Sequence, residues 1–365
     1  MVGMDRPFRS LTRRACLGSG LALAACDRAA RGQPPARPAA LPPLKAVAPF
    51  PVGSSVATDQ IADPGFAALF AANFSQLTPE WEMKMERVLK PDGGFDFAAA
   101  DRIAGFAAAT GARLHGHTLI WYAQDEAPAF RRIDGSPGFE NAYRNYILAV
   151  AGRYRGRAVG WDVVNEAVAE DGEGYRDCLW SRNLGPDYVA KAFGYAREAD
   201  PGAVLFLNDY NLENLPKKRA TFLRLAERLL AQGAPLGGLG SQTHLSMDTP
   251  PGAVKAAVAD LARLGLPIHI SELDVSTRSD RPSLMSPADR LERQARLVGE
   301  AAEALAALPA GQRYAFTAWG VRDKDSWLIR PPRGNPGEDH PLLFDDAGRP
   351  KPAAAAFAAA VRNRR

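Results

Sequence analysis

Eight short, mainly apolar runs of the kind that form β-strands recur along this chain of 365 residues, and longer helix-type stretches separate them. The β-type runs span residues 50–56, 74–77, 113–120, 159–165, 203–207, 239–242, 267–272 and 314–319. The main helix-type stretches, most of them rich in alanine, span residues 97–110, 140–154, 186–199, 215–232, 252–264 and 287–308. Strands that alternate with helices favour a parallel sheet. Eight such units in a chain of this length favour a closed (β/α)8 barrel in a single domain over an open sheet.

The first 45 residues do not share this pattern. Arg13 and Arg14 precede an apolar run at 17–25, the order typical of an export signal, and they resemble a twin-arginine signal. The sequence Leu-Ala-Ala-Cys at 23–26 resembles a bacterial lipobox, in which Cys26 would carry the lipid. A plain signal peptide cut after small residues is the alternative.

These patterns predict three segments: a signal peptide at 1–26, a linker rich in Pro, Ala and Arg at 27–45, and the barrel domain at 46–365. We therefore expect an exported protein, periplasmic or at the cell surface if it is lipid-anchored, and secreted otherwise. The lipid anchor would be its only contact with a membrane.

The charge distribution argues against nucleic acid as a partner. Eight basic and two acidic residues fall in 1–45, a formal charge of +6, whereas the whole chain carries +4. Residues 46–365 therefore carry about −2, and a nucleic-acid binder would keep its positive charge on the folded domain. A Gly-rich phosphate loop does not follow any of the predicted strands, and His, Cys and Asp do not cluster along the sequence, so we expect no cofactor and no metal.

Two predicted strands end in a carboxylate. The segments Trp-Asp-Val-Val-Asn-Glu-Ala at 161–167 and Ile-His-Ile-Ser-Glu-Leu-Asp at 268–274 bring Glu166 and Glu272 to the carboxyl ends of their strands. Barrel active sites lie at that rim. Cleavage of a glycosidic bond needs such a pair, one group to protonate the leaving oxygen and one to face the anomeric carbon.

Other polar and aromatic side chains follow the predicted strands at the same rim. They are Glu80, His117, Trp121, Asn165, Asn208, Tyr210, Gln242, His244, Asp274 and Trp319. A structural protein would have no reason to place costly polar groups at the same end of so many strands.

Eight motifs in order make the chain resemble glycoside hydrolase family 10, the barrel xylanases, over residues 46–363. They lie at 77–80 with Met83 and Lys84, 116–121, 161–167, 207–211, 240–245, 271–275, 316–325 with Trp327, and 341–352. The resemblance implies that Glu166 is the acid/base and Glu272 the nucleophile of a retaining enzyme. It implies that His244 bonds the nucleophile, that Asp274 orients His244, and that Asn165 bonds a sugar hydroxyl.

The resemblance also implies a set of sugar-binding residues. They are Glu80, Lys84, His117, Trp121, Gln124, Tyr210, Gln242, Trp319 and Trp327, although Tyr210 could instead brace the rim. Indole rings suit the C–H faces of sugars. Three positions depart from the family pattern: Trp81 stands where Asn is usual, Tyr122 where His is usual, and His115 where Arg is usual.

The resulting prediction is a monomeric endo-1,4-β-xylanase whose partner is xylan or a xylo-oligosaccharide. A related enzyme of the same fold that acts on aryl cellobiosides or short β-1,4-oligosaccharides is one alternative. A carbohydrate-binding barrel without activity is a remote one, because both glutamates are present.

Overall fold

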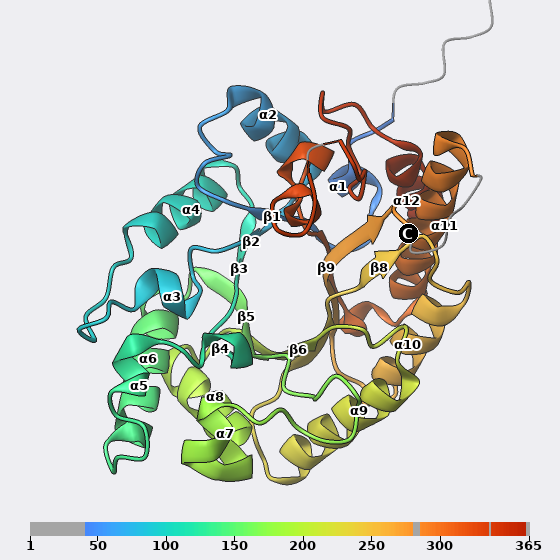
Figure 1. Cartoon of the computed structure of the whole chain (residues 1–365). Coiled ribbons are helices and arrows are strands. Elements are labelled where there is room, and N and C mark those ends of the chain that lie inside the picture. The colour runs from blue at the N-terminus through green and yellow to red at the C-terminus, as the bar shows by residue number, and fades with distance from the viewer. Residues whose placement is uncertain (1–40, 280–284, 336, 363–365) are drawn as a thin grey trace, which may run out of the picture. The chain divides into compact units, whose positions relative to one another are not determined.

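Eight parallel strands close into a barrel in the computed structural model, which describes residues 41–279, 285–335 and 337–362 (Figure 1). The barrel strands are β1 (Val52–Val56), β2 (Gln76–Pro79), β3 (Arg113–Gly116), β5 (Ala158–Asn165), β6 (Val204–Asp209), β7 (Gly238–Ser241), β9 (Ile268–Ser276) and β10 (Arg313–Ala318). Each pairs in parallel with the next, and β10 pairs with β1, so the sheet has no free edge. The predicted single-domain (β/α)8 barrel is confirmed, and each of its eight strands lies within a few residues of a predicted run.

Two short strands lie beyond this ring of eight. They are β4 (Ile120–Trp121), which pairs with β5, and β8 (His244–Ser246), which pairs with β9. Both extend the rim at the carboxyl ends of the barrel strands, and each includes one residue that the sequence assigns to the site, Trp121 and His244.

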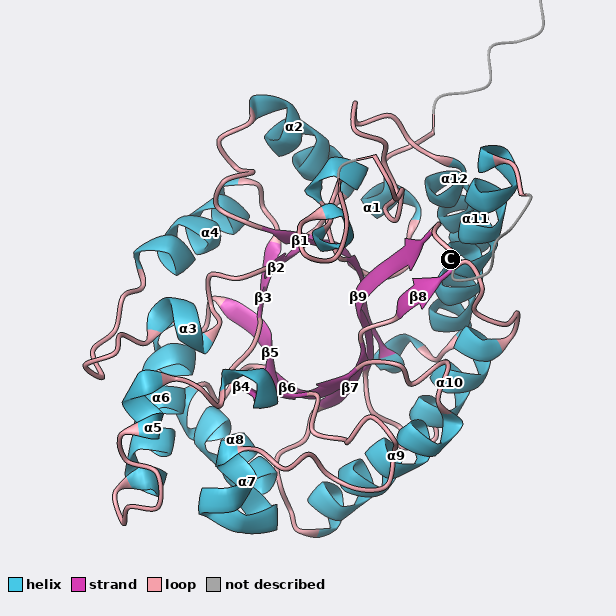
Figure 2. Ribbon diagram, in the orientation of Figure 1, coloured by secondary structure: helices cyan, strands magenta, loops and turns pink. Residues whose placement is uncertain are grey.

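Helices surround the strands as an outer layer (Figure 2). The α-helices are α1 (Leu44–Val47), α2 (Pro64–Asn73), α3 (Met85–Val88), α4 (Ala98–Ala109), α5 (Pro128–Arg131), α6 (Phe139–Arg153), α7 (Leu179–Leu184), α8 (Tyr188–Ala199), α9 (Pro216–Ala231), α10 (Ala253–Ala262), α11 (Pro287–Ala307) and α12 (Pro352–Arg362). Short 3-10 helices are η1 (Tyr122–Gln124), η2 (Gly185–Asp187), η3 (Ala310–Gln312), η4 (Asp323–Asp325) and η5 (Trp327–Ile329). All six predicted helices are present.

Helix α11 shows how the sequence specifies this layer. Ser286 caps its first turn by accepting a hydrogen bond from the amide of Asp289, whose carboxylate bonds back, and Pro287 occupies the first helical position. Leu297, Ala301 and Leu305 then recur at helical spacing and are buried. This stripe packs against α12 and β9 and holds the wall of the barrel that carries Glu272.

Strand β3 ends earlier than its sequence pattern predicts. The run 113–120 leaves the ladder after Gly116, and the His117–Thr118 peptide bond is cis. The backbone carbonyl of Asp162 then accepts hydrogen bonds from the Thr118 hydroxyl at 2.8 Å and the Leu119 amide at 3.1 Å. A side chain at Gly116 would collide with the Trp161 ring, 2.2 Å from an added Cβ. The close approach of these two strands therefore requires glycine here.

The barrel domain begins slightly before the predicted boundary. Helix α1 starts at Leu44, within the stretch assigned to the linker, and Leu44 is fully buried with its amide bonded to the Asn73 side chain. The predicted signal peptide and Cys26 lie outside the described residues. Within the described part of the chain, no helix combines the length and the apolar character needed to cross a membrane.

Candidate active site

A cleft of about 440 Å³ opens over the carboxyl ends of the strands. Its lining residues are Trp81, Lys84, His117, Trp121, Tyr122, Asn165, Glu166, Tyr210, Asn211, Gln242, His244, Glu272, Trp319, Trp327 and Arg333. Eleven of the residues that the sequence assigns to the site are among them, although they come from segments spread over more than two hundred positions.

Glu166 follows β5 directly, and hydrogen bonds hold its backbone amide, its backbone carbonyl and one oxygen of its carboxyl group. Its backbone has a positive φ of 61°, a conformation that a non-glycine residue adopts only when its surroundings fix it. Its amide donates to the Asn208 carbonyl at 2.8 Å, and its own carbonyl accepts from Nε of Arg176 at 2.9 Å. Its side-chain Oε1 accepts from Asn165 and from Gln242, each at 3.0 Å. The carboxyl group is therefore aimed into the cleft by its neighbours.

Glu272 lies within β9, and its carboxylate faces the same cleft. Oε1 accepts from Nδ2 of Asn208 at 2.8 Å, and Oε2 lies 3.5 Å from Nε2 of His244. Burial alone would raise the pKa of this carboxyl, but the charge of His117 and the bond and charge of His244 outweigh burial and hold the pKa below its usual value. Glu272 is consequently an anion at neutral pH.

His244 connects Glu272 to Asp274. Nδ1 of His244 lies 3.0 Å from Oδ1 of Asp274, whose Oδ2 accepts from the Trp327 indole at 2.7 Å. Burial opposes a charged ring, yet the two carboxylates raise the pKa of His244 to about 10. The imidazolium therefore keeps a positive charge beside Glu272. These contacts match the supporting positions that the resemblance implies for His244 and Asp274.

A pair of amides links the two glutamates. The side-chain amide of Asn208 donates to Oε1 of Glu272 and, at 2.9 Å, to Oδ1 of Asn165, whose own amide donates to Glu166. The Ser271 hydroxyl holds the Asn208 side chain in place by donating a hydrogen bond to its side-chain oxygen, Oδ1, at 2.7 Å. The two carboxyl groups thus share one hydrogen-bond network across the cleft floor.

The walls of the cleft are aromatic and positively charged. Nζ of Lys84 lies 4.4 Å from the ring centroid of Trp81 and 4.9 Å from that of Trp121. The His117 ring lies between Asp162, 2.9 Å from its Nδ1, and the Trp319 ring, 5.2 Å away between centroids. Flat rings beside polar groups suit a sugar, which presents apolar C–H faces and hydroxyls together.

Three predicted site residues do not line the cleft. Asp274 lies behind His244 and contacts its Nδ1. Glu80 is buried and paired with Nη1 of Arg330 at 3.2 Å, and burial raises its pKa to about 7 in spite of Arg330 and Lys84. Gln124 is buried on η1, where its amide donates to Glu86 at 2.9 Å.

The cleft also contains residues that sequence reasoning did not assign to binding. Trp81 and Tyr122 were singled out only as departures from the family pattern, and Asn211 only as part of a motif. Arg333 lies in an irregular loop, where its guanidinium is 4.0 Å from the Trp327 ring. Arg176, also in a loop, is not part of the lining but lies 4.0 Å from the ring of Tyr122, which is. Loop arginines carry no periodic signal, so the sequence alone gave no way to find these two.

Comparisons with known proteins agree with this arrangement. The model of glycosyl hydrolase family 10 matches residues 44–360. A β-1,4-xylanase of Dictyoglomus thermophilum is 37% identical over 311 residues, which are 83% of this chain and 86% of that one. Endo-1,4-beta-xylanase A of Caldicellulosiruptor sp. strain Rt8B.4 is 35% identical, and there the match covers 83% of this chain but only 45% of the longer relative.

Among solved structures, a thermostable mutant of a xylanase from Cellvibrio japonicus superposes with a TM-score of 0.80 at 32% identity. The match covers 88% of this chain and all of that one. Three findings agree: the family model spans nearly the whole barrel, the relatives are more than 30% identical, and the solved structure has the same barrel fold. The chain belongs to glycosyl hydrolase family 10.

Proposed function

We propose that this chain is a retaining endo-1,4-β-xylanase, with Glu166 as acid/base and Glu272 as nucleophile. The observation that carries the proposal is the joint position of the two carboxyl groups, which line one cleft and share one network of amide hydrogen bonds. The choice of xylan rests on the relatives that match over most of this chain and are named xylanases.

The first step of the mechanism forms a glycosyl-enzyme. Anionic Glu272 attacks the anomeric carbon while Glu166 gives its proton to the glycosidic oxygen, so that the C–O bond breaks and the leaving chain departs with a new hydroxyl. His244 stabilises the charge of Glu272 before attack. Asn165, whose amide contacts Glu166, would bond a sugar hydroxyl beside the reacting carbon.

The second step releases the sugar. Glu166, now a carboxylate, takes a proton from water, and the resulting hydroxide attacks the anomeric carbon and frees the Glu272 carboxylate. Two inversions at one carbon restore the β configuration. No metal takes part in either step.

Two assays test the proposal. Purified enzyme should release reducing sugar from xylan much faster than from carboxymethyl cellulose, and proton NMR of the earliest products should show the β anomer first. Faster hydrolysis of the cellulose derivative would replace the proposed substrate. Early appearance of the α anomer would contradict the retaining mechanism.

A further inference from the structure

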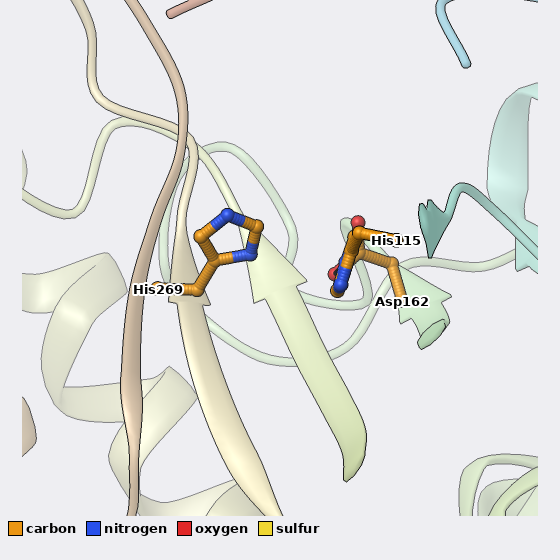
Figure 3. A group of neighbouring side chains, drawn as sticks. All are labelled: His115, Asp162 and His269. Carbon is orange, nitrogen blue, oxygen red and sulfur yellow. Dashed lines mark ion pairs between the residues drawn. The ribbon is translucent and has the colours of Figure 1, made fainter. Parts of the chain in front are cut away.

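Three buried side chains that the mechanism does not use meet inside the barrel. His115 on β3, Asp162 on β5 and His269 on β9 each offer one ligand atom, and these atoms lie within 4.8 Å of one another (Figure 3). All three residues are at most 1% exposed. They are spread over 155 positions of sequence, which is why sequence spacing predicts no metal, whereas barrel closure brings them together.

The atoms that face one another are the ones left without a hydrogen bond. Nε2 of His115, Oδ1 of Asp162 and Nδ1 of His269 are buried, and within the described residues none of them makes a hydrogen bond. The first two lie 3.2 Å apart and form a His–Asp ion pair, as Nδ1 of His244 and Oδ1 of Asp274 do at 3.0 Å. Figure 3 shows the His269 ring with one nitrogen turned toward the other two side chains. Buried polar atoms normally have partners, so Nδ1 of His269, which faces this pair and has none among the described residues, points to a missing shared one.

The opposite side of each residue is satisfied. Nδ1 of His115 lies 3.0 Å from the Tyr314 hydroxyl, and Nε2 of His269 lies 2.8 Å from the Thr317 hydroxyl. With a proton on each of these nitrogens, and with the Gln76 amide, 3.4 Å from Nε2 of His269, turned so that its oxygen faces the ring, each ring donates outward and keeps a lone pair on the inward nitrogen. Hydrogen bonds of this kind fix the orientation and tautomer of histidines that bind metals.

Asp162 is held in the same way. Its outer oxygen, Oδ2, lies 2.9 Å from Nδ1 of His117, and its inner oxygen, Oδ1, faces Nε2 of His115. Gly160 leaves space for the arrangement, because an added Cβ would lie 2.4 Å from the Tyr314 hydroxyl and 3.2 Å from Nδ1 of His115.

We propose that His115, Asp162 and His269 form a structural site for a divalent transition-metal ion, of which zinc is the test case. Two imidazoles and one carboxylate are a ligand set that zinc accepts, with a fourth position for water. Ligands of tetrahedral zinc lie about 3.3 Å apart, given bond lengths near 2 Å. The 3.2 Å between His115 and Asp162 already matches this spacing, and a small movement of His269 would complete it.

The site would connect to the cleft through Asp162, one oxygen of which would bind the metal while the other orients His117. The metal would therefore brace three barrel strands and one cleft residue, but it would take no part in bond cleavage. This role is independent of the proposed xylanase activity, and its failure would leave that proposal intact.

Metal content is the direct test. Protein without a histidine tag, produced in zinc-supplemented medium and dialysed against a weak chelator, should retain about one zinc per chain by mass spectrometry. A crystal at the zinc absorption edge should show one anomalous peak among the three side chains. Less than a tenth of an equivalent, or an ordered water with no anomalous signal at that position, would overturn the proposal.

Variants separate the site from adventitious binding. His115→Arg places a cation beside Asp162 but offers no lone pair, and His269→Leu removes the other nitrogen ligand. Both should lose the zinc, whereas the control His340→Ala, at a half-exposed histidine outside the cluster, should keep it. Zinc retained by both site variants would contradict the assignment.

Thermal unfolding gives a second measurement that does not require the variants. Zinc a hundredfold above its dissociation constant should raise the midpoint of refolded, metal-free protein by about 5 °C. An unchanged midpoint in the wild-type protein would overturn the structural role.

Discussion

At the scale of single residues, Glu166 and Glu272 have different hydrogen-bond partners, and the difference suits the different roles proposed for them. Glu272 sits beside the His244 cation, which suits a group that must be anionic before attack, whereas amide donors alone contact the carboxyl of Glu166 in the described structure. We expect Glu272→Ala to abolish turnover of every substrate. We expect Glu166→Ala to retain the first step on aryl glycosides with good leaving groups, because these need little protonation.

Azide provides the readout for this division of labour. In Glu166→Ala it should attack the glycosyl-enzyme, displace the Glu272 carboxylate and give a β-glycosyl azide, which NMR identifies. An α-glycosyl azide as the only product would mean that the two roles are reversed or wrong.

His244 should set the acidic limit of activity. Its charge helps to hold the pKa of Glu272 down, so removing that charge must raise the pKa of the nucleophile. We expect His244→Gln to move the acidic limb of the kcat/KM profile to higher pH by about one unit. Trp327→Phe is the matched control, because it removes the indole donor to Asp274 but leaves the cation. An equal shift in both variants would contradict the electrostatic account.

Trp81 offers a test of specificity. The family pattern places a sugar-contacting Asn here on the glycone side. In the structure the Trp81 indole lines the cleft wall and makes a cation–π contact with Nζ of Lys84. Indole has one donor and no acceptor, so it cannot reproduce a two-way bond to neighbouring hydroxyls. One neutral hydrogen bond is worth roughly 0.5–1.5 kcal/mol, or about two- to tenfold in rate.

We therefore expect Trp81→Asn to change kcat/KM for aryl xylobiosides by at least about twofold and to change it much less for aryl xylosides, which do not reach the second glycone subsite. Equal effects on both substrates, or a loss of thermal stability without a change in specificity, would show that Trp81 only packs the loop.

At the scale of elements, the turn between β2 and α3 should make stability depend on pH. Burial raises the pKa of Glu80 to about 7, against 4.5 for an ordinary glutamate. The folded state therefore holds this proton more tightly than the unfolded state. The contribution of this bound proton to the free energy of unfolding is complete below about pH 4.5, declines as the pH rises, and is lost above about pH 7. The change amounts to about 3 kcal/mol.

Glu80→Gln removes this titration. As the pH rises from 4.5 to 8, the unfolding free energy of the wild type should therefore fall relative to that of the variant. Urea unfolding at several pH values measures it. In Arg330→Met the loss of stability should begin at a higher pH than in the wild type, because Arg330 lowers the pKa of Glu80 more than Lys84 does. A constant difference across the range would contradict the raised pKa.

The elements were predictable from sequence where the pattern is local. Short apolar runs located all eight barrel strands, the longer and mostly alanine-rich stretches between them located the long helices, and polar residues after strands located the rim. The sequence pattern predicts strand β3 too long, because Thr118, Leu119 and Ile120 continue the β-type run past Gly116, where the strand ends in the structure. Asn208, which links the two glutamates, was named only as a rim residue, since its partners come from other strands.

Contacts across the barrel were beyond the reach of sequence. Gln124 follows a recognisable motif yet turns to Glu86, and the meeting of His115, Asp162 and His269 depends on strand order and register. Spacing along the chain carries no information about either. The family motifs identify the site residues, whereas the contacts between those residues depend on how the sheet closes.

At the scale of the whole molecule, the distribution of charge separates the leader from the enzyme. Residues 1–45 carry +6 and the remainder about −2, so the positive charge lies where an export signal needs it. We propose that the chain is exported and anchored through a lipid on Cys26.

Fractionation of cells that produce the full chain tests this proposal. Xylanase activity should be absent from the cytoplasm and should sediment with membranes, because a cysteine carrying lipid chains binds a bilayer firmly. Cys26→Ser should release the activity into the soluble exported fraction, since the barrel has no need of the anchor to fold. Cys16→Ser, within the predicted signal peptide, is the matched control and should leave the enzyme on the membrane. Unchanged sedimentation of the Cys26→Ser protein would refute the lipid anchor, and activity confined to the cytoplasm would refute export, while the enzymatic proposal would stand in either case.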